Sequence, residues 1–505
     1  MFLSGIFLET LEKKSSIIVE KAKFFIIRAL SYFSFLLIPI WAPKTLNLKP
    51  YELCLLMGFY VVFMAAQWFL LGKEIDHRFK IYFRVNSSID RILYRVFLGM
   101  FSCVLIFNLI ALLPVKWIYN SFWIMWIFQG LFYSWPTRGK IIHESVSSNL
   151  AEFRFLDSFE KTLFFLILII FVVSIPQIPI LYNYEALKLF FDPYEKFSTQ
   201  FWNFLTVNYF PFKRYSILLK YAWLMHFYVF GVGTFLLFFY AIMRFFVSRR
   251  LSMLAVFVVV SSWSFLKINE TQLGTALSAG YCITWVWSLV WVAKSSTYRA
   301  GLFLGLLTYW GTILNYTYTY LGIIQIILIY LFYLDDKTPW FRRQLIKYAS
   351  FGLGLALINY FFLVDYNEIH HVEYLRPIND FFLLLKRKSF FSLSYIGVIL
   401  YSFKVTSSRF KFLKNIGLPV LNLRQVGAAI LILICFGLLI ENSILTGMTG
   451  LWILTLFSIL PIEILFQGIS RLRNRRNFYY LVYIIIALLD SHFEGRIKTF
   501  VQLFK

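Results

Sequence analysis

Residues 162–181 read TLFFLILIIFVVSIPQIPIL, a run without a single charged side chain. An α-helix of this length is about 30 Å long, which matches the hydrocarbon thickness of a bilayer. Lipid offers the backbone no hydrogen-bond partners, so an isolated spanning segment has to be helical. The stretch therefore predicts a transmembrane helix, and comparable runs lie on both sides of it.

Together these runs predict an all-α fold, a polytopic transmembrane helix bundle of about 13–15 spans. Three of the runs, 300–314, 390–403 and 478–489, are short for a full crossing and could be tilted, re-entrant or half-helices. The expected spans are 24–42, 52–72, 96–115, 117–134, 162–181, 222–243, 251–266, 273–292, 300–314, 318–334, 348–364, 390–403, 425–440, 444–465 and 478–489.

The composition of the whole chain supports the same class. Of its 505 residues 60% are hydrophobic and 15% are charged, and the mean hydropathy is +0.71. A soluble domain carries about 25% charged residues, so this chain has too few to cover a water-facing surface. We expect a multi-pass protein of a bacterial cytoplasmic (inner) membrane. Its four cysteines lie inside apolar runs and form neither a disulfide framework nor a metal-binding spacing.

The net charge of +24 would suggest a nucleic-acid partner in a soluble protein. Here the Lys and Arg residues sit in short segments between apolar runs, where they orient a membrane protein and contact anionic lipids. We therefore expect membrane lipids as partners and no nucleic acid. If the N-terminus lies inside, the inner segments hold about twice as many Lys and Arg residues as the outer segments.

This orientation leaves two long outer segments, 182–221 and 365–389. Residues 1–161 contain four expected spans and amphipathic cytoplasmic loops, and we interpret them as an N-terminal module. Residues 162–505 then form a multi-span core. The polar residues that gather on the outer side of this core are the best candidates for a functional site.

The first candidate group lies in the segment 182–221. Glu185 and Asp192 are seven residues apart and would share one face of a helix. A carboxylate just beyond a span can act as a general base, bind a metal or be an ordinary solvated charge.

The second group lies in the sequence DYNEIHHVEYLRP, residues 365–377. His370 and His371 are flanked by Glu368 and Glu373. Imidazole and carboxylate together are chemically reasonable metal ligands, although a hydrophilic loop also contains such residues by chance.

Two further groups could bind anions. Lys386, Arg387 and Lys388 lie outside in this orientation, against the usual charge rule, and could hold a lipid phosphate. His492 and Arg496 follow the last apolar run, and an Arg fork suits a phosphate or a carboxylate. The alternatives are a headgroup-bound loop and a polar tail that caps the last helix.

The middle of the chain resembles a known family. Residues 162–334 are similar to the polytopic GT-C glycosyltransferases, which use lipid-phosphate-linked sugar donors. The family usually has an acidic pair in its first outer loop, whereas here Tyr184 precedes Glu185. The likeness lies in YNYEAL (182–187), NYFPFKRYSILLKYAWLMHFYVFGVG (208–233), FVSRR (246–250), LAVFVVVSSWSFLKINETQLGTALSAGY (254–281) and YRAGLFLGLLTYWGTILNY (298–316), and more faintly in HFEGR (492–496).

The resemblance implies a GT-C-like core with an extracytoplasmic active site and a polyprenyl-phosphate-linked sugar donor as partner. A divalent metal is a candidate cofactor, because some members of the family use one. Glu185 or Asp192 would deprotonate the acceptor hydroxyl. The departing lipid phosphate would be bound by the basic and imidazole side chains of the other groups, His370, His371, Lys386, Arg387, Lys388, His492 and Arg496.

Two other functional classes remain open on the sequence alone. A membrane transporter or flippase would contain discontinuous helices, and the stretch around Gly301, Gly305 and Gly311 could supply them. The short supply of charge within the spans counts against proton or sodium coupling. A non-enzymatic membrane scaffold subunit would account for the long amphipathic inner loops.

Overall fold

The computed structural model is helical throughout the part of the chain that it describes, and no β-strand occurs there. The all-α prediction is confirmed for these residues. Among the residues that the structure describes, two helices are long and apolar enough to cross a membrane, Pro50–Phe79 and Tyr221–Met243. The described residues are 47–81, 88–111, 156–174, 216–244, 249–261, 273–293, 297–314, 318–330 and 337–363, with short helical pieces within 19–30, at 127 and 130, and within 481–485.

The helices coincide with the expected apolar runs in these ranges. Some bounds differ: the helix Pro50–Phe79 continues past the end of the expected span 52–72. The last helix begins nine residues before the expected span 348–364. Pro339 suits a first helical position there, and the Thr338 hydroxyl accepts a hydrogen bond from the Phe341 amide at 3.3 Å. The elements are α2 (Pro50–Phe79), α3 (Ser88–Ala111), α6 (Ser158–Ser174), α10 (Ser216–Phe227), the π-helical η3 (Tyr228–Gly233), α11 (Thr234–Met243), α12 (Arg249–Ser261), α14 (Leu273–Ala293), the 3-10 turn η4 (Tyr298–Ala300), α15 (Gly301–Leu314), α16 (Tyr318–Leu328) and α17 (Pro339–Leu363).

Backbone contacts divide the chain into two compact units. Unit 1 comprises residues 1–78, 87–152 and 202–222, and unit 2 comprises residues 79–86, 153–201 and 223–505. The division into 1–161 and 162–505 expected from the sequence stays a prediction.

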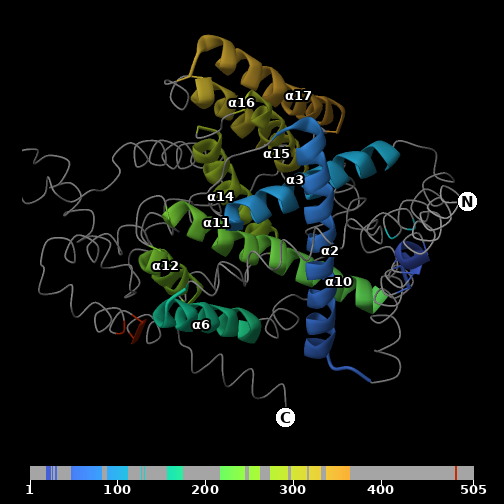
Figure 1. The fold of residues 1–505 in the computed structure, drawn as a ribbon, viewed down its shortest axis with the longest axis vertical. Helices are drawn as coiled ribbons and strands as arrows, with labels where there is room; N and C mark the ends of the chain where they lie inside the picture. Colours follow the sequence, from blue (N-terminus) through green and yellow to red (C-terminus); the bar gives the residue numbers. More distant parts are fainter. Residues whose placement is uncertain are drawn as a thin grey trace, which may run out of the picture. The chain divides into compact units, whose positions relative to one another are not determined.

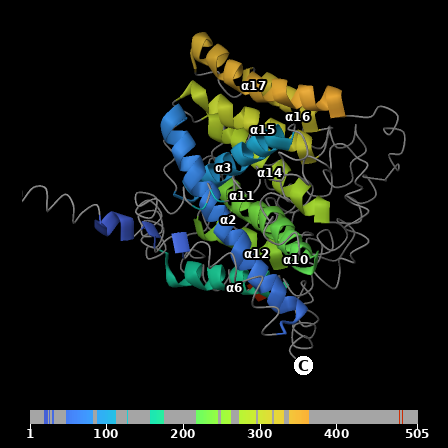
Figure 2. The same cartoon turned by 90° about the vertical axis from the view of Figure 1, so that its right-hand side faces the viewer.

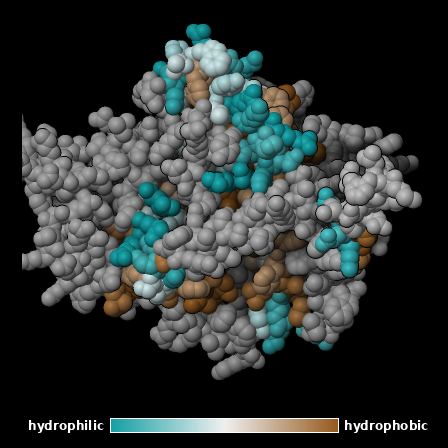
Figure 3. All heavy atoms as spheres, in the orientation of Figure 1, coloured by the Kyte–Doolittle hydropathy of each residue, from teal (hydrophilic) through white to brown (hydrophobic). Residues whose placement is uncertain are grey.

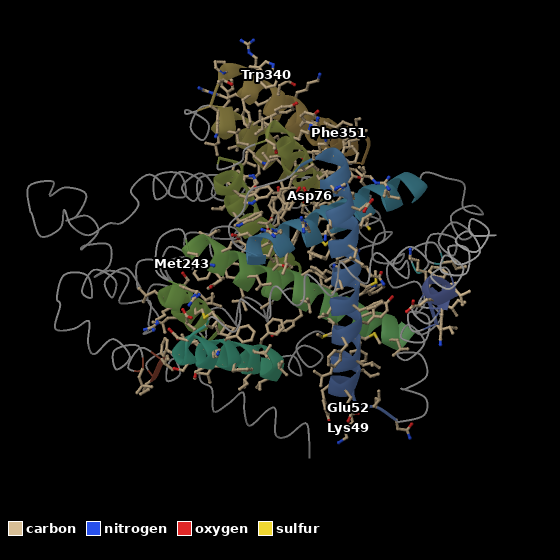
Figure 4. All side chains as sticks on the ribbon, viewed as in Figure 1. Lys49, Glu52, Asp76, Met243, Trp340 and Phe351 are labelled. Carbon is tan, nitrogen blue, oxygen red and sulfur yellow. The ribbon has the colours of Figure 1, made fainter. Side chains whose placement is uncertain are left out.

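In unit 1, α2 and α3 form an antiparallel pair whose backbones nearly touch. A Cβ atom at Gly72 would overlap the carbonyl oxygen of Arg95. A Cβ atom at Gly99 would overlap the carbonyl oxygen of Trp68. Close to this crossing, Arg95 donates a hydrogen bond of 3.2 Å to the buried carboxylate of Asp76, which Figure 4 labels near one end of α2. Small residues at a crossing are typical of helices that pack in membranes.

Unit 2 is a row of helices that follows the chain order except that α12 lies between α6 and α11. In Figures 1 and 2 the row runs from α6 at the bottom through α12, α11, α14 and α15 to α17 at the top. Each of these helices packs against the next one in the row, and α16 packs against both α15 and α17.

The direction of each helix follows from its side-chain contacts. In the middle of the row, a Cβ atom at Gly280 would lie 3.1 Å from the Phe230 carbonyl oxygen, and the rings of Trp287 and Phe238 are 4.9 Å apart. Residue numbers rise along both helices from the first contact to the second, so α14 runs parallel to η3 and α11.

α15 runs back against α14. The rings of Trp291 and Phe303 are 5.3 Å apart near one end of the pair, and the tip of Tyr281 lies against Gly311 near the other end. Residue numbers rise along one helix as they fall along the other, so the two helices are antiparallel.

Glycines bring α15 and α17 into direct backbone contact. A Cβ atom at Gly301 would overlap the Leu345 carbonyl oxygen, and one at Gly352 would overlap the backbone of Gly305. These contacts make α15 and α17 parallel. Gly301 and Gly305 form a G-x-x-x-G pattern, a motif of close helix packing in membranes. α15 is continuous across this pattern, so these glycines pack two helices together and do not interrupt one.

Charged pairs mark one end of the row, which we call the ion-pair end. Asp157 and Glu160 at the start of α6 contact Arg250 and Arg249 at the start of α12. With the helix directions above, α15 and α17 begin at this end, and α11 and α14 finish there. The opposite end of the row then holds the last residues of α6 and α17.

We expect Gly352→Ala to destabilise the protein, because the added methyl group would meet the backbone of α15. Overpacking of this kind costs about 1–3 kcal/mol. Gly354→Ala is the matched control on the same helix, because no atom lies within 4 Å of the position that its Cβ would take. Thermal unfolding of the purified protein should show a clear loss for Gly352→Ala and none for Gly354→Ala. Equal melting temperatures would contradict the close crossing of α15 and α17.

Candidate functional site

The candidate residues from the sequence all lie outside the described part of the chain. Their predicted roles therefore stay predictions. They are Glu185, Asp192, His370, His371, Lys386, Arg387, Lys388, His492 and Arg496.

The described helices that precede Glu185 and His370 finish on the same side of the row, although α6 and α17 lie at its two extremes. Ser174 ends α6, and Leu363 ends α17, and both helices begin at the ion-pair end. Both helices therefore finish at the opposite end of the row. The segment that contains Glu185 follows α6 in the sequence, and the segment that contains His370 follows α17. Trp223, near the start of the continuous helix α10–η3–α11, lies at this end as well, because that helix finishes at the ion-pair end.

At the ion-pair end, Asp157 and Glu160 cap the N-terminus of α6. The Glu160 amide donates to the Asp157 side chain at 2.7 Å, and the Asp157 amide donates to the Glu160 side chain at 3.0 Å. This reciprocal pair is a capping box with Asp in place of Ser or Thr, and it satisfies two backbone amides that the helix leaves free.

The same carboxylates then join α6 to α12. Arg249 Nε donates to Glu160 Oε1 at 2.7 Å, and Arg250 Nε donates to Asp157 Oδ2. The Glu160 side chain is only 2% exposed, whereas that of Arg249 is 40% exposed. The hydrogen bond to Glu160 raises the pKa of Arg249, so the guanidinium group stays charged at every physiological pH. We assign these four residues a structural role, because each carboxylate already has its partner.

A π-helical segment interrupts the regular helix on the side of the row opposite the ion pairs. The Tyr228 hydroxyl donates to the Phe171 carbonyl oxygen of α6 at 2.8 Å, and the rings of these residues are 4.5 Å apart. His226 is fully buried, with its ring 4.8 Å from that of Phe230. π-helical turns inside α-helices are frequent at functional sites. Here the widened turn lets Gly280 of α14 approach the backbone closely.

Next to this segment, α14, α15 and α16 meet along a face that is buried and polar. The rings of Tyr281 and Tyr318 stack at 4.8 Å, and the hydroxyls of Thr312 and Thr319 are 3.0 Å apart. A Cβ atom at Gly311 would overlap the tip of Tyr281, so glycine is required for this contact. We call this contact of the three helices the polar seam.

No group of three or more His, Cys, Asp or Glu side chains that could hold a metal occurs among the residues that the structure describes. Cys54, Cys103 and Cys282 are buried and free of disulfides. The candidate divalent-metal site around His370 and His371 falls outside these residues and stays a prediction.

Sequence reasoning did not identify the polar seam. Its members lie inside apolar runs, where isolated Thr, Tyr and Gln side chains do not change the periodicity. The available signal was the combination of small and hydroxyl residues in TYWGT, residues 308–312, followed after a short turn by YTYLG, residues 318–322. Such residues in two successive spans are typical of interhelical contacts in membranes.

The comparisons with known proteins add no relative. No protein-family model matches the chain, and neither a curated protein nor a solved structure matches it.

The burial of Glu160 predicts a large effect for the loss of its partner. We expect Arg249→Ala to lower the free energy of unfolding by about 1.5–3 kcal/mol, because it leaves a buried carboxylate without its charged donor. Arg78→Ala is the control, since Arg78 pairs with Glu74 at 2.9 Å on the surface, where its side chain is 72% exposed and such a pair is worth about 0–1 kcal/mol. Unfolding curves in denaturant measure both. A loss of similar size in the two variants would contradict the assigned role of Glu160.

Proposed function

We propose that the chain is a multi-pass membrane glycosyltransferase. It transfers a sugar from a polyprenyl-phosphate donor to an acceptor on the extracytoplasmic side, and the ion-pair end faces the cytoplasm. The observation that carries the proposal is the common end at which α6 and α17 finish. The segments that contain the candidate base and the candidate phosphate ligands are both attached there.

The distribution of charge supports this orientation. The charged side chains of unit 2 that the structure describes between Asp157 and Leu363 lie near the ion-pair end, and most are basic, as expected on the cytoplasmic side. Figure 3 shows hydrophilic side chains over the start of α12 and, at the top, over α17. The basic residues are Lys161, Arg244, Arg249, Arg250, Arg299, Lys337, Arg342, Arg343 and Lys347.

The outer face of α6 supports a lipid environment for unit 2. A helix face that stays both apolar and exposed is unusual in a soluble protein, where large apolar patches mark interfaces or membranes. The exposed residues recur at three- and four-residue intervals along one face of the helix. They are Phe164, Phe165, Leu168, Ile169 and Val172, each more than a third exposed.

The hydroxyl groups of these helices are bonded in a way that suits lipid. Five of them donate to the carbonyl oxygen four residues earlier in their own helix, so they need no water. The bonds run from Ser174 to Ile170, from Ser261 to Phe257, from Thr284 to Gly280, from Thr308 to Leu304 and from Thr312 to Thr308, at 2.7–3.1 Å.

In the proposed reaction the acceptor hydroxyl attacks the anomeric carbon of the donor sugar. Glu185 takes the proton of that hydroxyl, with Asp192 as the alternative base. The bond between the anomeric carbon and the phosphate oxygen breaks, and the lipid phosphate leaves with its negative charge. Basic side chains of the group Lys386, Arg387 and Lys388 stabilise that charge as it develops.

Two features weigh against ion-coupled transport, the main alternative. Residues 273–293, 301–314 and 318–328 contain no Asp, Glu, Lys, Arg or His, so the described seam between these helices offers no group that could carry a proton or bind sodium through a carboxylate. α15 is also an unbroken helix across its glycines.

We expect Glu185→Ala to reduce sugar transfer by about 10²–10⁴-fold, the usual contribution of a general base, while membrane insertion is retained. Glu195→Ala is the matched control, because it removes a carboxylate of the same expected outer segment. Glycan products of cells that carry each variant in place of the native chain measure the effect. Unchanged glycans in the Glu185 variant would remove this residue from the mechanism.

The orientation can be tested separately with a thiol reagent that does not cross membranes. We expect it to label Glu195→Cys and Asn379→Cys on intact cells, and Lys337→Cys only after the membrane is permeabilised. The cysteine already present at Cys435 is replaced by Ser in each variant, and the buried cysteines serve as internal controls. Labelling of Asn379→Cys and Lys337→Cys from the same side would overturn the proposed orientation.

A further inference from the structure

Three polar side chains in the polar seam are buried without a hydrogen-bond partner for their polar atoms. They are the Tyr281 hydroxyl, the Trp285 indole N–H and the amide of Gln325, in which both the nitrogen and the oxygen lack a partner. Gln325 is 1% exposed, Tyr281 is 3% exposed and Trp285 is fully buried. In native proteins such groups are rare, and each calls for an explanation such as a ligand that is absent from the structure.

The three groups lie along one line. Trp285 is one turn after Tyr281 on the same face of α14, and Gln325 is two turns after Tyr318 on the same face of α16. Tyr281 and Tyr318 stack on each other, which sets the level of the two helices. Both helices run from this stack toward the ion-pair end. Helix rise therefore places Trp285 about 6 Å and Gln325 about 10 Å beyond the stack.

The chemistry of the seam defines the ligand. The amide of Gln325 and the hydroxyl of Tyr281 can each donate and accept a hydrogen bond, whereas Trp285 can only donate. α14, α15 and α16 contain no ionisable acid or base other than Tyr and Cys side chains, so they offer a charged ligand no counter-charge. A ligand with several hydroxyl groups and no net charge satisfies all three residues.

We propose that the polar seam binds an uncharged, hydroxyl-bearing ligand between α14 and α16. The ligand accepts a hydrogen bond from Trp285 and exchanges hydrogen bonds with Tyr281 and Gln325. Because these groups are buried, the ligand enters when α16 moves away from α14 at the Tyr281–Tyr318 stack. The proposal does not depend on sugar transfer, and none of its residues takes part in the proposed reaction.

Stability measurements test the first part of this inference. A buried polar group without a partner destabilises the folded chain, so a near-isosteric apolar substitution should stabilise it. We expect Gln325→Met and Tyr281→Phe each to raise the melting temperature of the full chain in phosphatidylcholine nanodiscs by about 1–3 °C. Thr312→Val is the matched control in the same seam. It should lower the melting temperature, because the Thr312 hydroxyl is bonded to Thr308 and Thr319.

Ligand addition tests the second part. The probe is octyl glucoside below its micellar concentration, and octyl sulfate, with the same alkyl chain and a charged head, is the control. A ligand that binds only the folded chain raises its melting temperature. We expect octyl glucoside to raise that of the native chain more than octyl sulfate does, and this difference to vanish in Gln325→Met and Tyr281→Phe.

Three results would each overturn the inference. The first is a fall in melting temperature for Gln325→Met and Tyr281→Phe like that of Thr312→Val. The second is an equal response of the native chain to the two detergents. The third is a response to octyl glucoside that is as large in the variants as in the native chain. Because no transfer reaction is measured, these results leave the role of Glu185 to its own experiment.

Discussion

The contact between the start of α6 and the start of α12 determines how the rest of unit 2 can be interpreted. Glu160 is buried and its side chain is paired with Arg249 at 2.7 Å, while Asp157 pairs with Arg250 beside it. A buried carboxylate is tolerated only with such a partner, so the two helices must begin at one level. The directions of the other helices in the row, relative to these two, follow from the ring contacts and the glycine contacts. The contact of Tyr228 with Phe171 agrees with these directions, because it places the end of α6 beside η3, away from the ion-pair end.

Small residues account for the close packing that these directions require. Helices without side chains at their crossing can bring their backbones into contact, which increases the packed contact area. Gly301, Gly305 and Gly352 let α15 and α17 touch, and Gly280 lets α14 approach the π-helical segment η3. In unit 1 the pair Gly72 and Gly99 does the same for α2 and α3. In the sequence, Gly301, Gly305 and Gly311 suggested a broken helix. In the structure they lie within a continuous helix, where their lack of a side chain allows close packing.

The sequence predicted the helices well and the seam between them poorly, and the reason is physical. Apolar runs such as 273–292 and 300–314 locate helices because length and hydropathy are local properties, and α14 and α15 occupy these runs. The earlier starts of α3 and α17 were missed, because polar first turns do not look like spans. The polar seam depends on which faces of α14, α15 and α16 meet, and no local pattern contains that information. Arg249, Arg250 and Lys337 lie at one end of the row, and the assignment of their segments to the inside of a membrane stays a prediction.

The interior of unit 2 also limits which functions the fold can support. From α14 to α16 the helices are rich in Trp, Tyr, Thr and Gly and contain no side chain with a full charge. An ion that enters a protein interior loses its hydration shell, and a pathway for ions has to replace it. A seam without charged side chains can do so only with backbone carbonyls or with many aligned dipoles. An uncharged hydroxyl-bearing group loses far less on leaving water, and a few amide and hydroxyl groups can replace its hydrogen bonds. The charged side chains that the structure describes between Asp157 and Leu363 are instead gathered at the ion-pair end. The neutral contact of α14, α15 and α16 is therefore chemically better matched to an uncharged polar group than to an ion.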